Sequence, residues 1–241
     1  MKSFAIIGSA NPKSVSLQIT KRLFETIQMQ SDIPVEVDYF TLQDHHVNIC
    51  QGCESCFAYG KCPLDERTDD SMKKLKSELL SSDVLVFVAP IYFGNISAGM
   101  KLIVDRLSYW SHLLMLHNKL GIGIIVSDGH SHLDGLNYLS LVMESLGLSI
   151  VSNIPIQRKM ILDPAALNSV LSYTAMQSLN FYKSQGYPLT NRQRLQFSTM
   201  QTKIRKLTAG SEYNYWMDHG YLTYDSFDDL VKDKLDKMPH E

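Results

Sequence analysis

Short apolar runs recur along the first two thirds of the chain, and stretches with helical spacing separate them. A run at residues 35–40, VEVDYF, alternates between apolar and polar positions, as a half-buried edge strand does. Four other runs are apolar at nearly every position, which is typical of parallel strands buried on both faces. These four runs are residues 3–8, 83–90, 121–127 and 149–156.

Apolar residues at helical spacing lie between each pair of neighbouring runs. They are Leu23, Phe24 and Ile27; Met72, Leu75 and Leu79; Met100, Ile103, Val104, Leu107, Trp110 and Leu114; and Leu136, Leu139, Val142 and Leu146. This alternation predicts an α/β fold with a doubly wound, five-stranded parallel sheet. Ligands of such sheets bind beyond the carboxyl ends of the strands, where the strand order reverses. The predicted binding loops are therefore residues 8–16, 90–97 and 127–135.

The pattern changes after about residue 163, where a long helix is predicted over residues 164–182. Turn signals and a further helical pattern follow, and then EYNYWMDHGYLTYDSF at residues 212–227, which is rich in aromatic residues. We therefore predict a sheet domain at residues 1–160 and a helical C-terminal extension at residues 161–241. Because exposed aromatic patches mark interfaces, the extension is expected to serve oligomerisation or to cap its own subunit.

The composition is that of an ordinary globular protein, with 44% hydrophobic residues, 20% charged residues and a formal net charge of −2. This charge favours no nucleic-acid partner. No run approaches the roughly 18 consecutive apolar residues of a membrane span, and the apolar run near the N-terminus is short for a signal peptide. We expect a cytoplasmic protein with neither nucleic acid nor membrane as a partner.

The first predicted binding loop, GSANPKSVS at residues 8–16, is rich in small and hydroxyl side chains. Backbone amides at a helix N-terminus, together with Ser and Asn side chains, make a phosphate site. The loop lacks the three glycines of the Rossmann pattern, and Pro12 stands where a P-loop has glycine. A single monophosphate, as FMN carries, suits this loop, and a helix cap without a ligand is the alternative.

The second predicted binding loop, PIYFGNIS at residues 90–97, follows a buried run. We expect Tyr92 and Phe93 to be exposed there, beside the backbone amides of Gly94 and Asn95. An isoalloxazine ring needs this combination, because its faces stack and its pyrimidine edge forms hydrogen bonds. A core role for the two aromatic residues is the alternative, although both cannot easily point into the sheet.

All four cysteines of the chain lie in CQGCESCFAYGKC at residues 50–62, followed by Pro63. A reducing compartment disfavours disulfides. The spacing CxxCxxCx5C is close to the ferredoxin run CxxCxxCxxxCP, whose thiolates ligate [4Fe–4S] clusters. Zinc, with His45 or His46 as an additional ligand, is the main competitor, and a CxxC redox dithiol is a third possibility. The predicted cluster ligands are Cys50, Cys53, Cys56 and Cys62.

Together these features resemble the flavodoxin-like NAD(P)H-dependent FMN reductase superfamily, and within it the iron-sulfur flavoproteins. The resemblance covers residues 3–157 and includes an Asp-Asp pair that opens a helix and a Ser-x3-Lys-x3-Asp-Arg segment. The matching positions are Gly8, Ser9, the cysteines, Asp69, Asp70, Pro90 to Tyr92, Ser97, Lys101, Asp105 and Arg106. The chain departs from the family pattern at Asn11, where many members have arginine. Lys101 and Asp105 are one helical turn apart, and we interpret them as a structural salt bridge.

The resemblance implies an FMN-binding (iron-sulfur) flavoprotein that acts in electron transfer or as an NAD(P)H-dependent oxidoreductase. It implies phosphate ligands Ser9, Asn11, Ser14 and Ser16, a ring site at Pro90, Ile91, Tyr92, Phe93, Gly94 and Asn95, and closure by Asp128 and Gly129. No catalytic acid or base is nominated, because the flavin itself carries the redox chemistry. The implied partners are a reduced donor such as NAD(P)H and a protein or small-molecule acceptor, with assembly as a homodimer or homotetramer.

Two other functions remain open from the sequence. One is an NAD(P)H:FMN or quinone reductase in which the cysteine loop holds no metal. The other is a zinc-stabilised, non-enzymatic interaction protein on the same scaffold.

Overall fold

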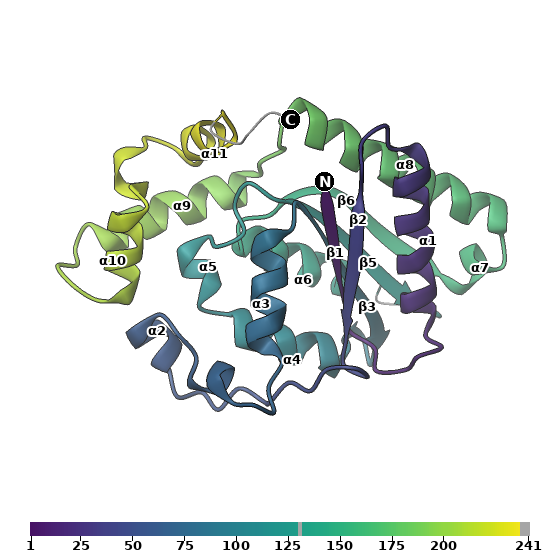
Figure 1. Ribbon diagram of the computed structural model, residues 1–241, viewed down its shortest axis with the longest axis horizontal. Coiled ribbons are helices and arrows are strands. Elements are labelled where there is room, and N and C mark those ends of the chain that lie inside the picture. Colours follow the sequence, from purple (N-terminus) through teal and green to yellow (C-terminus); the bar gives the residue numbers. More distant parts are fainter. Residues whose placement is uncertain (130–131, 237–241) are drawn as a thin grey trace.

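A parallel sheet forms the centre of the computed structural model, which describes residues 1–129 and 132–236 (Figure 1). Its strand order is β2-β1-β3-β5-β6. The strands are β1 (Lys2–Ile7), β2 (Glu36–Thr41), β3 (Val84–Tyr92), β5 (Leu120–Ser127) and β6 (Ser149–Gln157), with a two-residue antiparallel β4 (Asn95–Ile96) beside β3. This order is the flavodoxin-like one, so the predicted doubly wound fold is confirmed.

The burial of each strand follows from its place in the sheet. β3 and β5 lie inside and are buried almost throughout, whereas β2 lies at one edge and alternates between exposed and half-buried positions over most of its length, as predicted. The prediction that residues 149–156 are buried on both faces is wrong for part of that run. There Val151 is half-buried and Asn153 is exposed, because β6 forms the opposite edge of the sheet.

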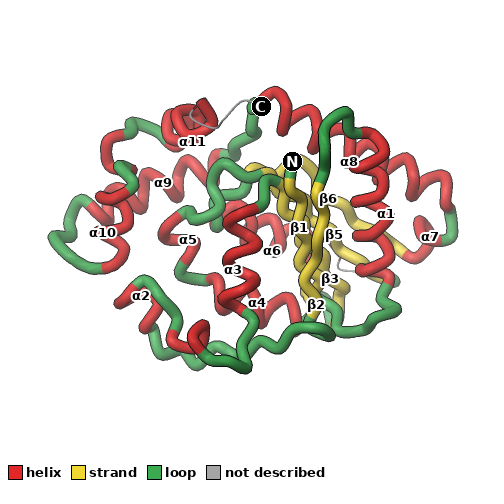
Figure 2. The backbone as a smooth tube through the Cα atoms, viewed as in Figure 1, coloured by secondary structure: helices red, strands yellow, loops and turns green. Residues whose placement is uncertain are grey.

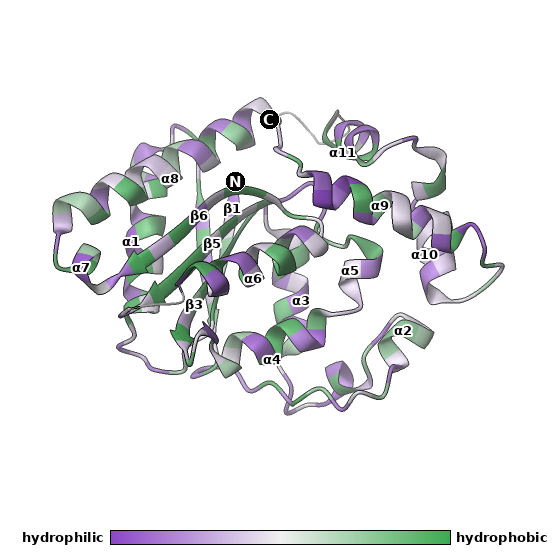
Figure 3. Ribbon diagram, turned by 180° about the vertical axis from the view of Figure 1, so that it is seen from behind, coloured by the Kyte–Doolittle hydropathy of each residue, from purple (hydrophilic) through white to green (hydrophobic). Residues whose placement is uncertain are grey.

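Helices cover both faces of the sheet (Figures 1 and 3). One face carries α1 (Val15–Gln30) and α8 (Pro164–Ser184), which pack against each other. The other carries α3 (Met72–Ser81), α4 (Ala98–Leu107) and α6 (His132–Ser145). The predicted helical extension therefore begins with a helix, α8, that covers strands β5 and β6.

The described part of the extension after α8 consists mainly of helices at one end of the molecule (Figure 2). Aromatic side chains pack together there into a small core. Trp216 stacks on Phe197, with ring centroids 5.4 Å apart, and meets Tyr221 edge-on at 5.3 Å. Trp216 and Tyr221 are fully buried in their own chain, so the expectation of an exposed aromatic patch is wrong for these two side chains. The helices are α9 (Asn191–Ile204), α10 (Ser211–Asp218) and α11 (Phe227–Asp236), with a 3-10 turn at Tyr221–Thr223. Residues 237–241 of the predicted extension lie outside the described residues.

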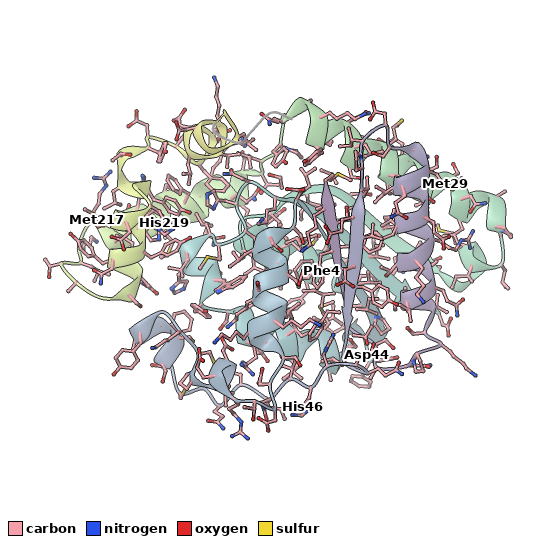
Figure 4. The ribbon with its side chains drawn as sticks, viewed as in Figure 1. Phe4, Met29, Asp44, His46, Met217 and His219 are labelled. Atoms are coloured by element: carbon pink, nitrogen blue, oxygen red, sulfur yellow. The ribbon has the colours of Figure 1, made fainter. Side chains whose placement is uncertain are left out.

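Side chains are buried or exposed as the sequence pattern predicts (Figure 4). Phe4 of β1 lies in the buried core, whereas Met29 on the outer side of α1 is exposed.

Short helices complete the chain between these elements. They are α2 (Ser55–Tyr59), a 3-10 turn at Pro63–Glu66, α5 (Trp110–Leu113) and α7 (Arg158–Ile161). Within the described residues, none of the helices is long and apolar enough to span a membrane.

Candidate functional site

The first and second predicted binding loops meet where the carboxyl ends of β1 and β3 lie side by side. The amide of Gly8 donates to the carbonyl of Val88 at 2.8 Å, and the Ser97 hydroxyl donates to the carbonyl of Gly8. A Cβ atom at Gly8 would lie 2.7 Å from the Cβ of Met100 and 2.8 Å from the Ser97 hydroxyl. Only glycine therefore fits this junction, which is the switch point of the strand order.

The first loop is held in its turn by its own side chains. The Ser14 hydroxyl caps α1 by accepting the amide of Leu17 at 3.2 Å. The Asn11 side chain accepts the amide of Lys13 at 2.9 Å, and the Ser9 hydroxyl accepts the amide of Asn11 at 3.3 Å. These bonds fix the loop at the N-terminus of a 16-residue helix, where the helix dipole favours an anion.

The second loop is a tight hairpin. β3 continues to Tyr92 and turns through Phe93 and Gly94, so that Tyr92 pairs with Asn95 in β4. Both turn residues have positive φ, 48° for Phe93 and 81° for Gly94, as in a type I′ turn. Tyr92 is 63% exposed and Phe93 is fully exposed, as expected. A bulky residue with positive φ is uncommon, and such strain occurs often at binding sites.

The third loop places Asp128 and Gly129 at the surface, and residues 130 and 131 lie outside the described residues. Next to it lie polar groups that the sequence interpretation missed. The hydroxyl of Ser127 is buried at the end of β5 without a hydrogen-bond partner in the described chain. Nδ1 of His132 lies 3.1 Å from the side-chain amide of Gln157. Ser127 and Gln157 end neighbouring parallel strands, a position that could have identified them from the sequence.

Four free thiols lie along the loop that leads from β2 to α3. Cys50 and Cys53 are exposed, whereas Cys56, in α2, and Cys62 are half-buried. Glycines with positive φ flank the middle of this loop, Gly52 at 64° and Gly60 at 73°. A Cβ atom at Gly52 would meet no described atom within 4 Å, apart from its chain neighbours, so the loop has room to move there.

The thiols share one electrostatic neighbourhood without forming a finished metal site. Burial raises the pKa of Cys56, and the nearby thiols of Cys62 and Cys50 raise it further. Hydrogen bonds from Ser55 lower the pKa of Cys53. Among the described residues, no group of three or more His, Cys, Asp or Glu side chains is arranged to hold a metal ion. The donor set thus suits an iron–sulfur cluster in its chemistry, but binding would require the thiols to converge.

The two histidines considered as zinc ligands do not extend the thiol group. His45 stacks on the ring of Phe40, with centroids 4.5 Å apart, and burial lowers its pKa. His46 lies at the rim of the molecule and is exposed (Figure 4).

A buried cluster of charges ties both ends of the cysteine loop to α4. The Arg106 guanidinium donates to Asp70 at 2.6 Å, to Asp65 at 2.6 Å and to the carbonyl of Asn48 at 2.8 Å. Lys76 donates to the other oxygen of Asp65 at 2.5 Å. The side chains of Arg106 and Asp70 are fully buried. Because Asn48 precedes the first cysteine and Asp65 follows the last, this cluster fixes where the loop starts and where it ends.

Asp70 is ionised within this cluster. Burial alone would raise its pKa, but hydrogen bonds from Arg106, Met72 and Asn48 outweigh burial and lower the pKa below its ordinary value. The predicted pair of Lys101 and Asp105 is also present, as a half-exposed ion pair on α4.

The strand order and the adjoining loops at the switch point define a protein of the flavodoxin-like class. The chain belongs to the family described as NADPH-dependent FMN reductase, whose profile matches residues 1–156.

Similar sequences include several iron-sulfur flavoproteins. One from Methanocaldococcus jannaschii is 30% identical over 126 residues, which is 52% of this chain and 62% of that protein. One from Archaeoglobus fulgidus is 28% identical over 149 residues, which is 61% of this chain and 64% of that protein. The match thus spans less than two thirds of the length of these two relatives.

Solved structures with the same fold are more distant in sequence. RosB, determined with a bound riboflavin-phosphate intermediate, superposes with a TM-score of 0.63 at 11% identity, over 88% of this chain and 89% of RosB. An NADH:FMN oxidoreductase in its apo form gives a TM-score of 0.56 at 16% identity, over 73% of this chain and 88% of that protein. At these identities the similarity concerns the fold alone.

Neighbouring aspartates provide a test of the buried charge cluster. Asp70→Asn is expected to lower the free energy of unfolding by about 3–5 kcal/mol at neutral pH, because it removes one partner of a buried ion pair. Asp69→Asn is the matched control, since Asp69 pairs with Arg67 at the surface, and we expect a much smaller loss. Urea unfolding monitored by circular dichroism measures both variants.

The difference between wild type and Asp70→Asn should also depend on pH. The folded-state pKa of Asp70 is lowered, so its stabilisation is present above the unfolded-state pKa and is lost as the pH falls through the folded-state pKa. Equal losses for the two variants at neutral pH would contradict the assigned role of the cluster.

Proposed function

We propose that the protein is an FMN-dependent oxidoreductase that passes electrons from NAD(P)H or a reduced protein to an acceptor. The observation that carries this proposal is the junction of the two binding loops at Gly8, in a chain that belongs to an FMN reductase family. A flavin accepts a hydride and releases electrons singly, so no protein acid or base is required for the redox step.

The FMN phosphate would bind at the first loop, with Ser9, Asn11, Ser14 and Ser16 and the N-terminus of α1. The exposed rings of Tyr92 and Phe93, with Asn95 at the end of the hairpin, would shape the flavin ring site. The buried, unpaired hydroxyl of Ser127 supports this assignment, because a ligand at the strand ends would satisfy it.

We further propose that Cys50, Cys53, Cys56 and Cys62 hold a [4Fe–4S] cluster. Their spacing supports this proposal, and the room around Gly52 would allow the thiols to converge. Such a cluster would exchange single electrons with the flavin. A reductase whose cysteine loop is free of metal is the second candidate, and the exposure of Cys50 and Cys53 favours it.

The acceptor would be a redox protein or a small molecule, and the chain would assemble as a homodimer or homotetramer. The exposed side chains of Tyr92, Phe93 and Ile49, from the hairpin and the cysteine loop, support an assembly that covers them.

Asn95→Ala tests the ring site. We expect FMN affinity to fall roughly tenfold, the effect of losing one hydrogen bond to the ring. Asn168→Ala is the control, because Asn168 lies on α8, outside the predicted binding loops, and accepts a hydrogen bond from Arg22 of α1. Titration of apoprotein with FMN, monitored by quenching of flavin fluorescence, measures both. Equal affinities would argue against the hairpin as the ring site.

Metal and flavin analysis of anaerobically purified protein tests the cluster. We expect one FMN and about four iron atoms per chain, with broad absorbance under the flavin bands. Cys56→Ser should lose most of the iron and keep the FMN. A clean flavin spectrum without iron would support the metal-free reductase, and a colourless protein with zinc would contradict both candidates.

A further inference from the structure

Helix α10 of the C-terminal extension contacts α2, in the middle of the cysteine loop. The Ser211 hydroxyl, in the first turn of α10, donates to the carbonyl of Phe57 in α2 at 2.6 Å. The Ser211 side chain also packs 3.4 Å from the position a Cβ would take at Gly60, the C-cap of α2. Helix α2 carries Cys56 and has no fully buried residue, so these contacts help to hold it in place.

A second contact runs through the side chain of Phe57. Its ring lies 5.0 Å from the imidazole of His112 and 6.5 Å from the ring of Tyr109, measured between centroids. His112 in turn pairs with Glu212 at 2.6 Å, and Lys203 pairs with the other oxygen of Glu212 at 2.5 Å. Glu212 follows Ser211 directly, so one short segment of the extension contacts the backbone of α2 through Ser211 and reaches the Phe57 ring indirectly, through His112.

The segment that makes these contacts is itself firmly anchored. The indole of Trp216, one turn further along α10, donates to the carbonyl of His112 at 2.9 Å. The same indole is buried against Phe197 of α9. The α2 side is less closely packed, since a groove of about 340 Å³ lies between the two segments, lined by Glu54, Phe57, Leu207, Gly210 and Tyr213 among others. The anchored α10 therefore supports α2 through few groups.

We propose that Ser211 and Glu212 are positioning residues for the cysteine loop, holding α2 so that the half-buried Cys56 stays in place while the part of the loop around Gly52 remains free to move. The residues lie beyond residue 156, where the match to the family profile ends. Ser211 and Glu212 would position α2 whether or not the thiols bind a cluster. That this positioning helps to retain a cluster rests on the proposed function.

Thiol reactivity of the apoprotein tests the proposal directly. Cys53 is exposed and serves as an internal reference for Cys56. In Ser211→Ala, and in Ser211→Ala combined with Glu212→Gln, the ratio of Cys56 to Cys53 alkylation by iodoacetamide should rise about threefold to tenfold. This is the range expected when loss of a hydrogen bond shifts a local opening equilibrium. Peptide mass spectrometry measures both sites in one sample.

Two further variants control for indirect effects. Glu144→Gln is matched to Glu212→Gln, because both carboxylates are nearly buried, at 12% and 13% exposure, and both pair with basic residues of α9. Glu144 lies on α6 and should leave the ratio unchanged. Ser211→Thr keeps a hydroxyl at this position, so its ratio of Cys56 to Cys53 alkylation should equal that of the wild type. An unchanged ratio in the folded double variant, or an equal rise in Glu144→Gln, would overturn the proposal.

Iron retention in the holoprotein separates this proposal from the proposed function. If the wild type holds iron, the double variant should lose it faster to a chelator while its FMN content stays constant. If the wild type holds no iron, the cluster assignment fails, but the alkylation ratio still decides whether Ser211 and Glu212 position the loop.

Discussion

The buried guanidinium of Arg106 is the constraint on which the arrangement of the site depends. Removing a charge from water is costly, and here the carboxylates of Asp65 and Asp70 balance the positive charges of Arg106 and Lys76 within one cluster. Of the three guanidinium nitrogens of Arg106, only Nε has no hydrogen-bond partner among the described residues. Helix α4 is capped by Ser97, beside the loop junction, and ends at Leu107, next to Arg106, so one rigid element of about 15 Å sets the cysteine loop relative to the flavin loops.

The local pattern in the sequence predicts the sheet well, and long-range pairing accounts for what it misses. β3 and β5 are recognisable because burial on both faces leaves almost no polar positions. The salt bridge of Lys101 and Asp105 follows from helical spacing, whereas Arg106 and Asp70 are 36 positions apart and only the fold brings them together. Likewise, Trp216 is buried because Phe197, from a separate helix, stacks on it.

The candidate site combines a fixed part and an adjustable part. The loop at Gly8 and the hairpin at Phe93 are set by close backbone contacts and a tight turn, and this rigidity suits a ring that must be oriented. The hairpin could not be predicted from the sequence, because Phe is an unusual residue at positive φ. The cysteine loop is instead tied at both ends and supported at α2, with open space at Gly52, an arrangement that would suit thiols gathering around the proposed cluster.

We propose that one scaffold holds FMN at the switch point and a cluster on the cysteine loop that Arg106 secures. The decisive measurement is a crystal structure of anaerobically purified, FMN-loaded protein. We expect the FMN phosphate at the Gly8 loop, the ring beside Tyr92 and Asn95, and all four cysteine Sγ atoms on one iron–sulfur cluster. Flavin bound away from the ends of β1 and β3, or a cysteine loop whose thiols stay apart in protein shown to contain iron, would contradict it.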